Sequence, residues 1–183
     1  MKTGKILKNF TAKDGRNVIL RTPKWKDLDD LLELINLLVD EKAEIYITQK
    51  FTREEEAEWL LKVLSRLEKN EQFFLTAEVD KKVIALSDFQ INDGDEEHRV
   101  GAFGIIVRKG YRNLGIGTEI MKTLLEQAEF FGLETVTVNA FVTNKRAIHV
   151  YEKVGFVESD IIPDRYFRGD RLIDQIVLTK SIS

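Results

Sequence analysis

Residues 112–118 form the stretch whose residue types and spacing are best suited to chemistry. An apolar run, GIIV, is followed by a turn that carries Gly115 and Gly117, and the turn runs directly into an amphipathic helix. Glycines let the backbone fold tightly with no side chain in the way, so several amide hydrogens can converge on one anion at a helix N-terminus. Arg112 and the hydroxyl of Thr118 are placed to assist. The sequence therefore predicts a diphosphate-binding turn.

The same turn has a simpler explanation, because two glycines near a helix start often do no more than shape the backbone. No Gly-Lys-Ser/Thr sequence ends the turn, and its Arg-x-x-Gly-x-Gly spacing is not the dinucleotide-binding fingerprint. Nucleotide hydrolysis and hydride transfer are therefore disfavoured. The choice between anion binding and a plain turn depends on the rest of the chain.

A second group of residues lies about thirty positions further on, within NKRAIHVYEKVGF. Tyr151 carries a phenolic proton that a general acid can donate. An aromatic residue at helical spacing from Ala147 and Val154 is more often part of a core, and the pattern alone favours that interpretation.

Together the two motifs resemble the GNAT superfamily of N-acetyltransferases, over roughly residues 70–180. The motifs are Arg112-x-x-Gly115-x-Gly117 and Asn144-x-x-Ala147-x-x-x-Tyr151-x-x-x-Gly155-Phe156. The chain is most similar to the branch that contains ribosomal-protein alanine, phosphinothricin and polyamine acetyltransferases. It departs from the usual pattern at Lys109, where relatives often have proline.

The resemblance implies an α/β (α+β) fold with a mixed, mostly antiparallel central sheet and helices on both faces. The sheet would be splayed open beside Val107, and the pantetheine arm of acetyl-CoA would fill the opening and pair with β-strand main chain. Asn144 would bond the arm, and Tyr151 would protonate the departing thiolate. The implied cofactor-binding residues are Ile105, Val107, Arg112, Asn113, Leu114, Gly115, Ile116, Gly117, Thr118, Asn144 and Tyr151. No metal is implied.

The proposed reaction is direct attack of an amine on the thioester, which requires a group that removes the amine's proton. Glu97 is the candidate base beside Tyr151 as the acid, and His98 is a second candidate because it titrates near neutrality when unperturbed. The alternative is that both side chains are solvated at a polar strand end, too far from the thioester to act.

The acceptor is not specified by either motif. Acidic residues in residues 93–97 and between the first two predicted helices would favour a cationic acceptor, although acidic loops are often simply solvated. These residues are Glu41, Glu44, Asp93, Asp95, Glu96 and Glu97, with Tyr46 and Phe51 nearby. The expected acceptor is a protein N-terminus, a polyamine or another small amine. The alternatives are a non-catalytic acyl-CoA binding module and a structural domain.

Hydrophobic periodicity predicts the elements that position these residues. A hairpin over 5–22 turns at Gly15, a helix opens at Thr22 and Pro23, and a second helix is capped by Thr52 with Glu55. Strands follow over 72–79, 83–91 and 98–107, then a helix over 115–131, a strand over 134–141, a helix over 144–154 and a strand over 172–180. Residues 158–171 are interpreted as a long polar loop.

Composition limits the remaining possibilities. The 183 residues fit one domain over 1–183, with 43% hydrophobic residues and no cysteine. A net charge of −3 makes nucleic acid an unfavourable partner, and two histidines argue against a multi-histidine metal site. The N-terminus has no signal-peptide pattern and no run is apolar enough for a membrane span, so we expect a cytoplasmic protein. Because members of the superfamily are often dimers, the resemblance allows for a homodimer.

Overall fold

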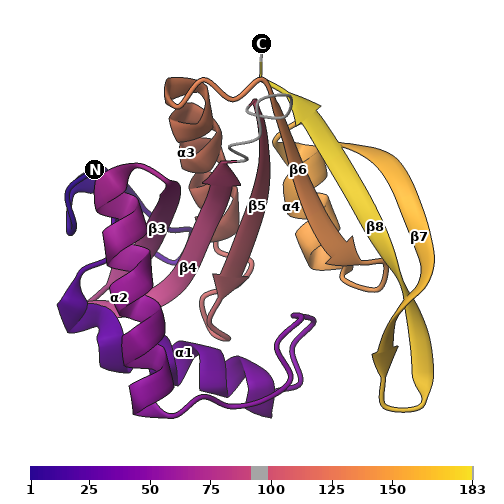
Figure 1. The fold of residues 1–183 in the computed structure, drawn as a ribbon, viewed down its shortest axis with the longest axis horizontal. Coiled ribbons are helices and arrows are strands. Elements are labelled where there is room, and N and C mark those ends of the chain that lie inside the picture. The colour runs from indigo at the N-terminus through magenta and orange to yellow at the C-terminus, as the bar shows by residue number, and fades with distance from the viewer. Residues whose placement is uncertain (92–98, 183) are drawn as a thin grey trace.

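The computed structural model describes residues 1–91 and 99–182, and the strands within these ranges form one sheet. The strands are β1 (Ile6–Thr11), β2 (Asn17–Arg21), β3 (Gln72–Val79), β4 (Lys82–Ile91), β5 (Val100–Val107), β6 (Thr135–Phe141), β7 (Val157–Arg168) and β8 (Arg171–Ser181). Their order across the sheet is β1-β2-β3-β4-β5-β6-β8-β7 (Figure 1). Every neighbouring pair is antiparallel except β5 and β6, which are parallel. The predicted mixed, mostly antiparallel sheet is confirmed.

Helices cover both faces of the sheet, as predicted (Figure 1). They are the 3-10 helix η1 (Trp25–Asp27), α1 (Leu28–Asp40), α2 (Arg53–Lys69), α3 (Ile116–Phe130) and α4 (Lys145–Lys153). Adjacent strand residues point to opposite faces, so Phe74 packs on Trp59 of α2 while Phe73 packs on Phe131, which follows α3. In the described ranges, no helix is long and apolar enough to cross a membrane.

The α3 face of the sheet is built on a row of aromatic rings. Phe73, Phe89 and Phe103 occupy neighbouring strands, and their ring centroids are 5.1 and 5.4 Å apart. Phe156 continues the row, 6.1 Å from Phe103. Such contacts add to the burial of large apolar side chains, which makes this face a firm support for the residues around it.

The first helix begins later than predicted. The hairpin of β1 and β2 is confirmed, with a φ of 87° at Gly15. Lys24 is extended, with a φ of −138°, so no helix opens at Thr22 and Pro23. The Lys24 amide donates to the Asp27 carboxylate at 2.9 Å, and η1 then leads into α1.

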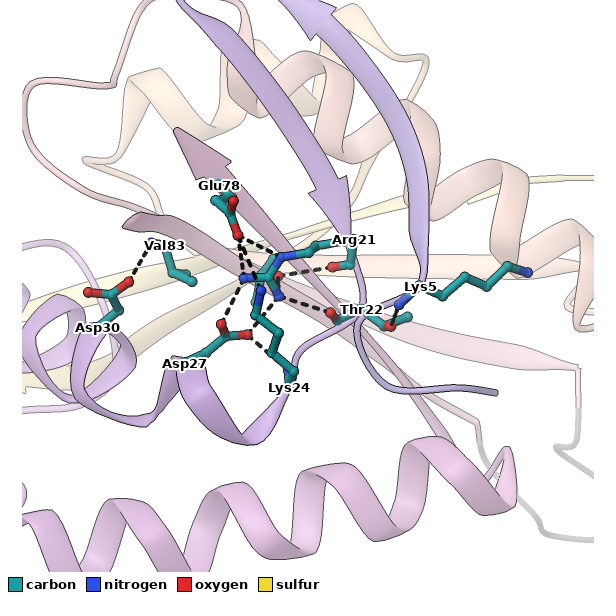
Figure 2. Close-up of polar contacts among 9 residues, drawn as sticks. Lys5, Arg21, Thr22, Lys24, Asp27, Asp30, Glu78 and Val83 are labelled. Atoms are coloured by element: carbon teal, nitrogen blue, oxygen red, sulfur yellow. Dashed lines mark hydrogen bonds and ion pairs between the residues drawn. The ribbon is translucent and has the colours of Figure 1, made fainter. Parts of the chain in front are cut away.

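This later start places Asp27 beside Arg21 in a buried ion cluster (Figure 2). Two nitrogens of the Arg21 guanidinium donate to the two Asp27 carboxylate oxygens, each at 2.7 Å. The Nε atom of Arg21 donates to Glu78 at 2.8 Å. Arg21 and Asp27 are 4% and 3% exposed, and each of their charges has a bonded partner. The cluster ties β2 to β3 and to the start of α1.

The second helix starts as predicted. The Thr52 hydroxyl accepts from the Glu55 amide at 3.2 Å, and the Glu55 carboxylate accepts from the Thr52 amide at 2.8 Å. This reciprocal capping box satisfies two amides that a helix N-terminus would otherwise leave unbonded.

The interpretation of residues 158–171 as a loop is wrong. Residues 157–168 form β7, which pairs with β8 at the edge of the sheet. Most of its side chains are exposed, and the pairing register shifts between Ile162 and Tyr166, a stretch that includes Pro163. An edge strand tolerates proline and polar residues on both faces, so it lacks the alternating pattern by which strands are recognised.

The sheet parts in the middle, where the sequence predicts an opening. The pairing of β5 with β6 runs from Val100↔Thr135 to Phe103↔Val138 and then stops. Beyond that point β5 still pairs with β4 as far as Val107, and β6 still pairs with β8 as far as Phe141. The two strands therefore diverge, each with one unpaired edge (Figure 1).

Candidate functional site

The free edge of β5 presents the main-chain groups of Ile105 and Val107 to the opening. In an antiparallel ladder, successive residues bond to opposite sides of the strand. The Arg108 amide donates to the Ile84 carbonyl at 2.8 Å, which fixes residues 106 and 104 as those that bond to β4. Ile105 and Val107 consequently face away from β4, as pairing with an extended ligand would require.

The turn at 112–118 presents a set of open donors. Asn113 and Gly115 adopt left-handed conformations, with φ of 65° and 85°, and Gly115 is the N-cap of α3. The first bond into α3 runs from the Glu119 amide to the Gly115 carbonyl at 3.1 Å. Within the described ranges, no amide from residue 112 to residue 118 is bonded to a protein acceptor. The amides of Asn113, Leu114, Gly115, Ile116, Gly117 and Thr118 are thus free to bond a ligand at the positive end of the helix dipole, and their binding of a diphosphate stays a prediction.

Arg112 lies between the turn and the opening. Its Nε atom donates to the Val107 carbonyl at 2.8 Å, and its guanidinium forms an ion pair with Glu41. The residue predicted to assist anion binding thus already contacts two groups of the site, and its positive charge is shared with a carboxylate.

The β1–β2 hairpin supports the turn, a contact that sequence reasoning missed. The Lys13 amide donates to the Leu114 carbonyl at 3.1 Å, and Arg16 donates to the Gly110 carbonyl at 3.1 Å. The Arg16 guanidinium lies 4.2 Å from the centre of the Tyr111 ring. No sequence pattern predicts this contact, because the partners are about a hundred residues apart in the chain.

Asn144 is the N-cap of α4. Its side-chain oxygen accepts from the Ala147 amide at 3.2 Å, and its amide nitrogen donates to the Glu44 carbonyl at 3.4 Å. Thr143 donates to the Glu44 carboxylate at 2.5 Å. In this structure Asn144 starts α4 and anchors residues 41–51, and its contact with a cofactor arm stays a prediction.

Tyr151 is held on the inner face of α4. It is 5% exposed, and its ring centroid lies 6.1 Å from that of Phe156. Burial raises the pKa of Tyr151 to about 12, because the phenolate would be poorly solvated there. The hydroxyl is therefore a proton donor throughout the neutral range.

Tyr46, Phe141 and Tyr166 form an aromatic cluster at the C-terminal end of β6. Tyr46 stacks on Tyr166 at 4.8 Å and meets Phe141 edge-on at 5.1 Å. Arg168 of β7 donates to the carbonyls of Ala43 and Ile45, at 2.7 and 3.1 Å. Burial, the hydrogen bond to Tyr166 and the charge interactions with Tyr166 and Tyr151 raise the pKa of Tyr46 above its usual range. Residues 41–51 thereby join α1 to the β7–β8 hairpin.

The structure does not test the predicted bases. Glu97 and His98, and the acidic Asp93, Asp95 and Glu96, are outside the described residues. The two carboxyls with the most strongly raised pKa in the described ranges, Glu56 and Asp88, were not singled out from the sequence.

Two sequence comparisons bear on this site. The sequence profile of the acetyltransferase (GNAT) family matches residues 31–156. An N-alpha-acetyltransferase of Sulfurisphaera tokodaii is 26% identical over 170 residues, which cover 87% of this chain and 92% of that protein.

Solved structures share the fold. A ribosomal-protein-alanine N-acetyltransferase from Brucella melitensis superposes with a TM-score of 0.78 at 19% identity, over 88% of this chain and 98% of the other. A GNAT superfamily phosphinothricin acetyltransferase from Sinorhizobium meliloti, in complex with acetyl-CoA, gives a TM-score of 0.78 at 18% identity, over 94% of this chain and 89% of the other.

Proposed function

Because the chain belongs to the acetyltransferase (GNAT) family, we propose that it is an N-acetyltransferase that moves the acetyl group of acetyl-CoA to a primary amine. The observation that carries this proposal is the position of an unpaired strand edge next to a turn with unbonded amides. The edge of β5 at Ile105 and Val107 leads directly to the unbonded amides of residues 112–118.

These two sets of groups suit the two parts of acetyl-CoA. An extended pantetheine arm pairs with a free strand edge, and a diphosphate suits the amides and dipole of a helix N-terminus. Acetyl-CoA supplies an acyl carbon activated as a thioester. Arg112 adds a positive charge next to the turn, once its contact with Glu41 is exchanged.

The chain's own residues then have defined tasks. The Val107 amide, on the free edge of β5, is a donor for the oxygen that becomes negative when the amine attacks. Tyr151 donates a proton to the departing sulfur. Its raised pKa keeps the hydroxyl protonated at neutral pH before the reaction.

The names of the relatives support a choice of acceptor class. They include an N-alpha-acetyltransferase, a ribosomal-protein-alanine acetyltransferase and a phosphinothricin acetyltransferase. We propose the same class here, with a peptide N-terminus or an amino-acid-like amine ahead of a polyamine. The second candidate, a binding module without catalysis, would have no use for the hydroxyl of Tyr151.

Replacing Tyr151 with phenylalanine tests the enzyme against the binding module. Tyr151→Phe keeps the ring against Phe156 and removes the proton donor, so turnover should fall roughly a hundredfold while the Kd for acetyl-CoA stays within severalfold. Turnover is measured by thiol release with an alanyl peptide, phosphinothricin and putrescine as acceptors, and Kd by calorimetry. Binding of acetyl-CoA with no release on any acceptor would favour the binding module.

A further inference from the structure

Asp88 lies on β4, beside β5, at the level where β5 and β6 begin to diverge. Asp88 pairs with Gly104 on β5, one residue after the last pair that joins β5 to β6. Its neighbour Phe89 faces α3 through the aromatic row, so the Asp88 side chain points to the opposite face, under α2.

A cavity of about 220 Å³ opens beside this carboxyl. It lies between α2 and the strands β3 and β4, and its lining includes the rings of Trp59 and Phe74. The charged groups that share the cavity with Asp88 are Lys62 and Arg66 of α2. The cavity thus combines an apolar wall with groups of both charges, and Asp88 is the lining residue that lies against Gly104 of β5.

One oxygen of Asp88 is held in place and the other is left open. The Oδ2 atom accepts from the Gln72 side-chain amide at 2.8 Å. Arg66 donates to the carbonyl oxygen of the same amide at 3.2 Å, which fixes the amide's orientation. Among the described residues, no donor bonds to Oδ1.

Gly104 keeps space free in front of that open oxygen. A Cβ atom at this position would lie 2.9 Å from Oδ1 of Asp88, closer than side chains normally approach. The absence of a side chain therefore lets the carboxyl reach the main chain of β5, at the residue that precedes Ile105.

Burial also changes the basicity of this group. The pKa of Asp88 is raised to about 6 by burial, and the Gln72 hydrogen bond only partly offsets the shift. A carboxylate with such a pKa is still ionised at neutral pH, yet it accepts a proton more readily than an exposed aspartate.

Building on the proposed function, we propose that Asp88 is the catalytic base, and that the acceptor amine reaches the thioester from the α2 face of the sheet. Tyr151, on the α4 face, acts from the other side. The acid and the base then lie on opposite faces of the sheet, and the acyl carbon would lie in the opening beside β5.

The proton balance is complete with these two groups and water. The ammonium form of the acceptor gives one proton to Asp88, and the free amine attacks the acyl carbon to form the C–N bond. The nitrogen loses its second proton to water, the C–S bond breaks, and the sulfur takes the proton of Tyr151. Tyr151 is then reprotonated from water and Asp88 releases its proton to solvent, so that each turnover yields one net proton.

The test is Asp88→Asn, which keeps the size and the acceptor for Gln72 but removes the base. We measure kcat/KM against pH between 5 and 10 with acetyl-CoA and an alanyl peptide. The native protein should lose activity on the acid side near pH 6, whereas Asp88→Asn should be roughly a hundredfold slower at pH 7. Its acid limb should move up to the pKa of the amine itself, with an unchanged Kd for acetyl-CoA.

Two further variants keep the test decisive. Glu56→Gln removes another buried carboxyl with a raised pKa and should leave the acid limb near pH 6. Gly104→Ala keeps the carboxyl but crowds Oδ1, and should lower kcat/KM at least tenfold even if Asp88→Asn folds poorly. An unaltered pH profile in Asp88→Asn, or loss of the limb in Glu56→Gln, overturns the role of Asp88. Native protein that acetylates no amine would instead overturn the proposed function.

Discussion

Arg21 and Asp88 are both charged side chains set into the same sheet, but their surroundings leave them in opposite states. Arg21 is bonded to Asp27 and Glu78, and Thr76 and the Thr22 carbonyl accept its remaining donors. Among the described residues Asp88 has one hydrogen-bond partner, Gln72, and a cavity lies beside it. A buried charge that is fully paired has no capacity left for a ligand, so the Arg21 cluster is structural. A partly buried charge with an open oxygen, such as that of Asp88, is available for chemistry.

The difference shows in the pKa values as well. Burial would lower the pKa of Arg21, yet its two carboxylate partners more than offset that effect and raise it. At Asp88 burial prevails, because only a neutral amide opposes it. The number of opposite charges around each group, rather than its depth, decides the sign.

The largest effect should come from breaking the paired region. Arg21→Ala leaves the buried Asp27 without a counter-charge and leaves Glu78 with Lys24 alone, at 3.7 Å, and should lower the free energy of unfolding by about 3–5 kcal/mol. Urea denaturation followed by circular dichroism measures this loss. Arg53→Ala is the matched control, since its ion pair with Asp29 is exposed and should contribute less than about 1 kcal/mol. Equal losses in the two variants would show that burial of the pair is irrelevant.

A second, smaller effect is the pH dependence of stability, which should differ between a carboxyl without an ion-pair partner and a paired one. Burial raises the pKa of Glu56 from 4.5 to about 7, so the folded protein binds this proton more tightly than the unfolded chain does. Its stabilising contribution is complete below pH 4.5 and is lost as the pH rises through 7. Glu56→Gln should therefore be more stable than the native protein at pH 8, by about 1–3 kcal/mol, and the gain should disappear near pH 4.

Thermal unfolding of both proteins between pH 4 and pH 8 checks this difference. Glu33→Gln is a useful contrast, because Arg108 and Lys82 hold the pKa of Glu33 down to about 2 and the effect has the opposite sign. A Glu56→Gln variant less stable than native at pH 8 would mean that the carboxylate has a stabilising role.

Sequence reasoning located the features that short segments determine. The capping box at Thr52, the turn at Gly15 and the motif that starts α3 all depend on residues within a few positions of one another. The family resemblance supplied the sheet and its opening. Contacts between distant segments were missed, because no local pattern encodes the approach of Glu78 to Arg21 or of Lys13 to Leu114. The edge strand β7 was missed for a related reason, since it buries too little to show an alternating pattern.

The smallest effect concerns the positive charge of Arg112, next to the turn at residues 112–118. Arg112 shares its guanidinium between the Val107 carbonyl and Glu41, both of which are less buried than the Arg21 cluster. Glu41→Gln should free this cation and remove a negative charge near the turn. The Kd for acetyl-CoA should then fall two- to fivefold at low salt, equivalent to about 0.5–1 kcal/mol, and less at high salt.

Asp40→Asn provides the matched control for that measurement. It removes the same charge one residue away, but Asp40 pairs with the exposed Lys50 and has no contact with Arg112. Calorimetric titration should therefore show tighter binding in Glu41→Gln alone. Equal tightening in both variants would reduce the effect to net charge, and weaker binding in Glu41→Gln would mean that Glu41 positions Arg112 for the diphosphate. In either case, the ability of a charged side chain such as Arg112 to bind a ligand would depend on the geometry of its existing contacts. How deeply the side chain is buried would not predict it.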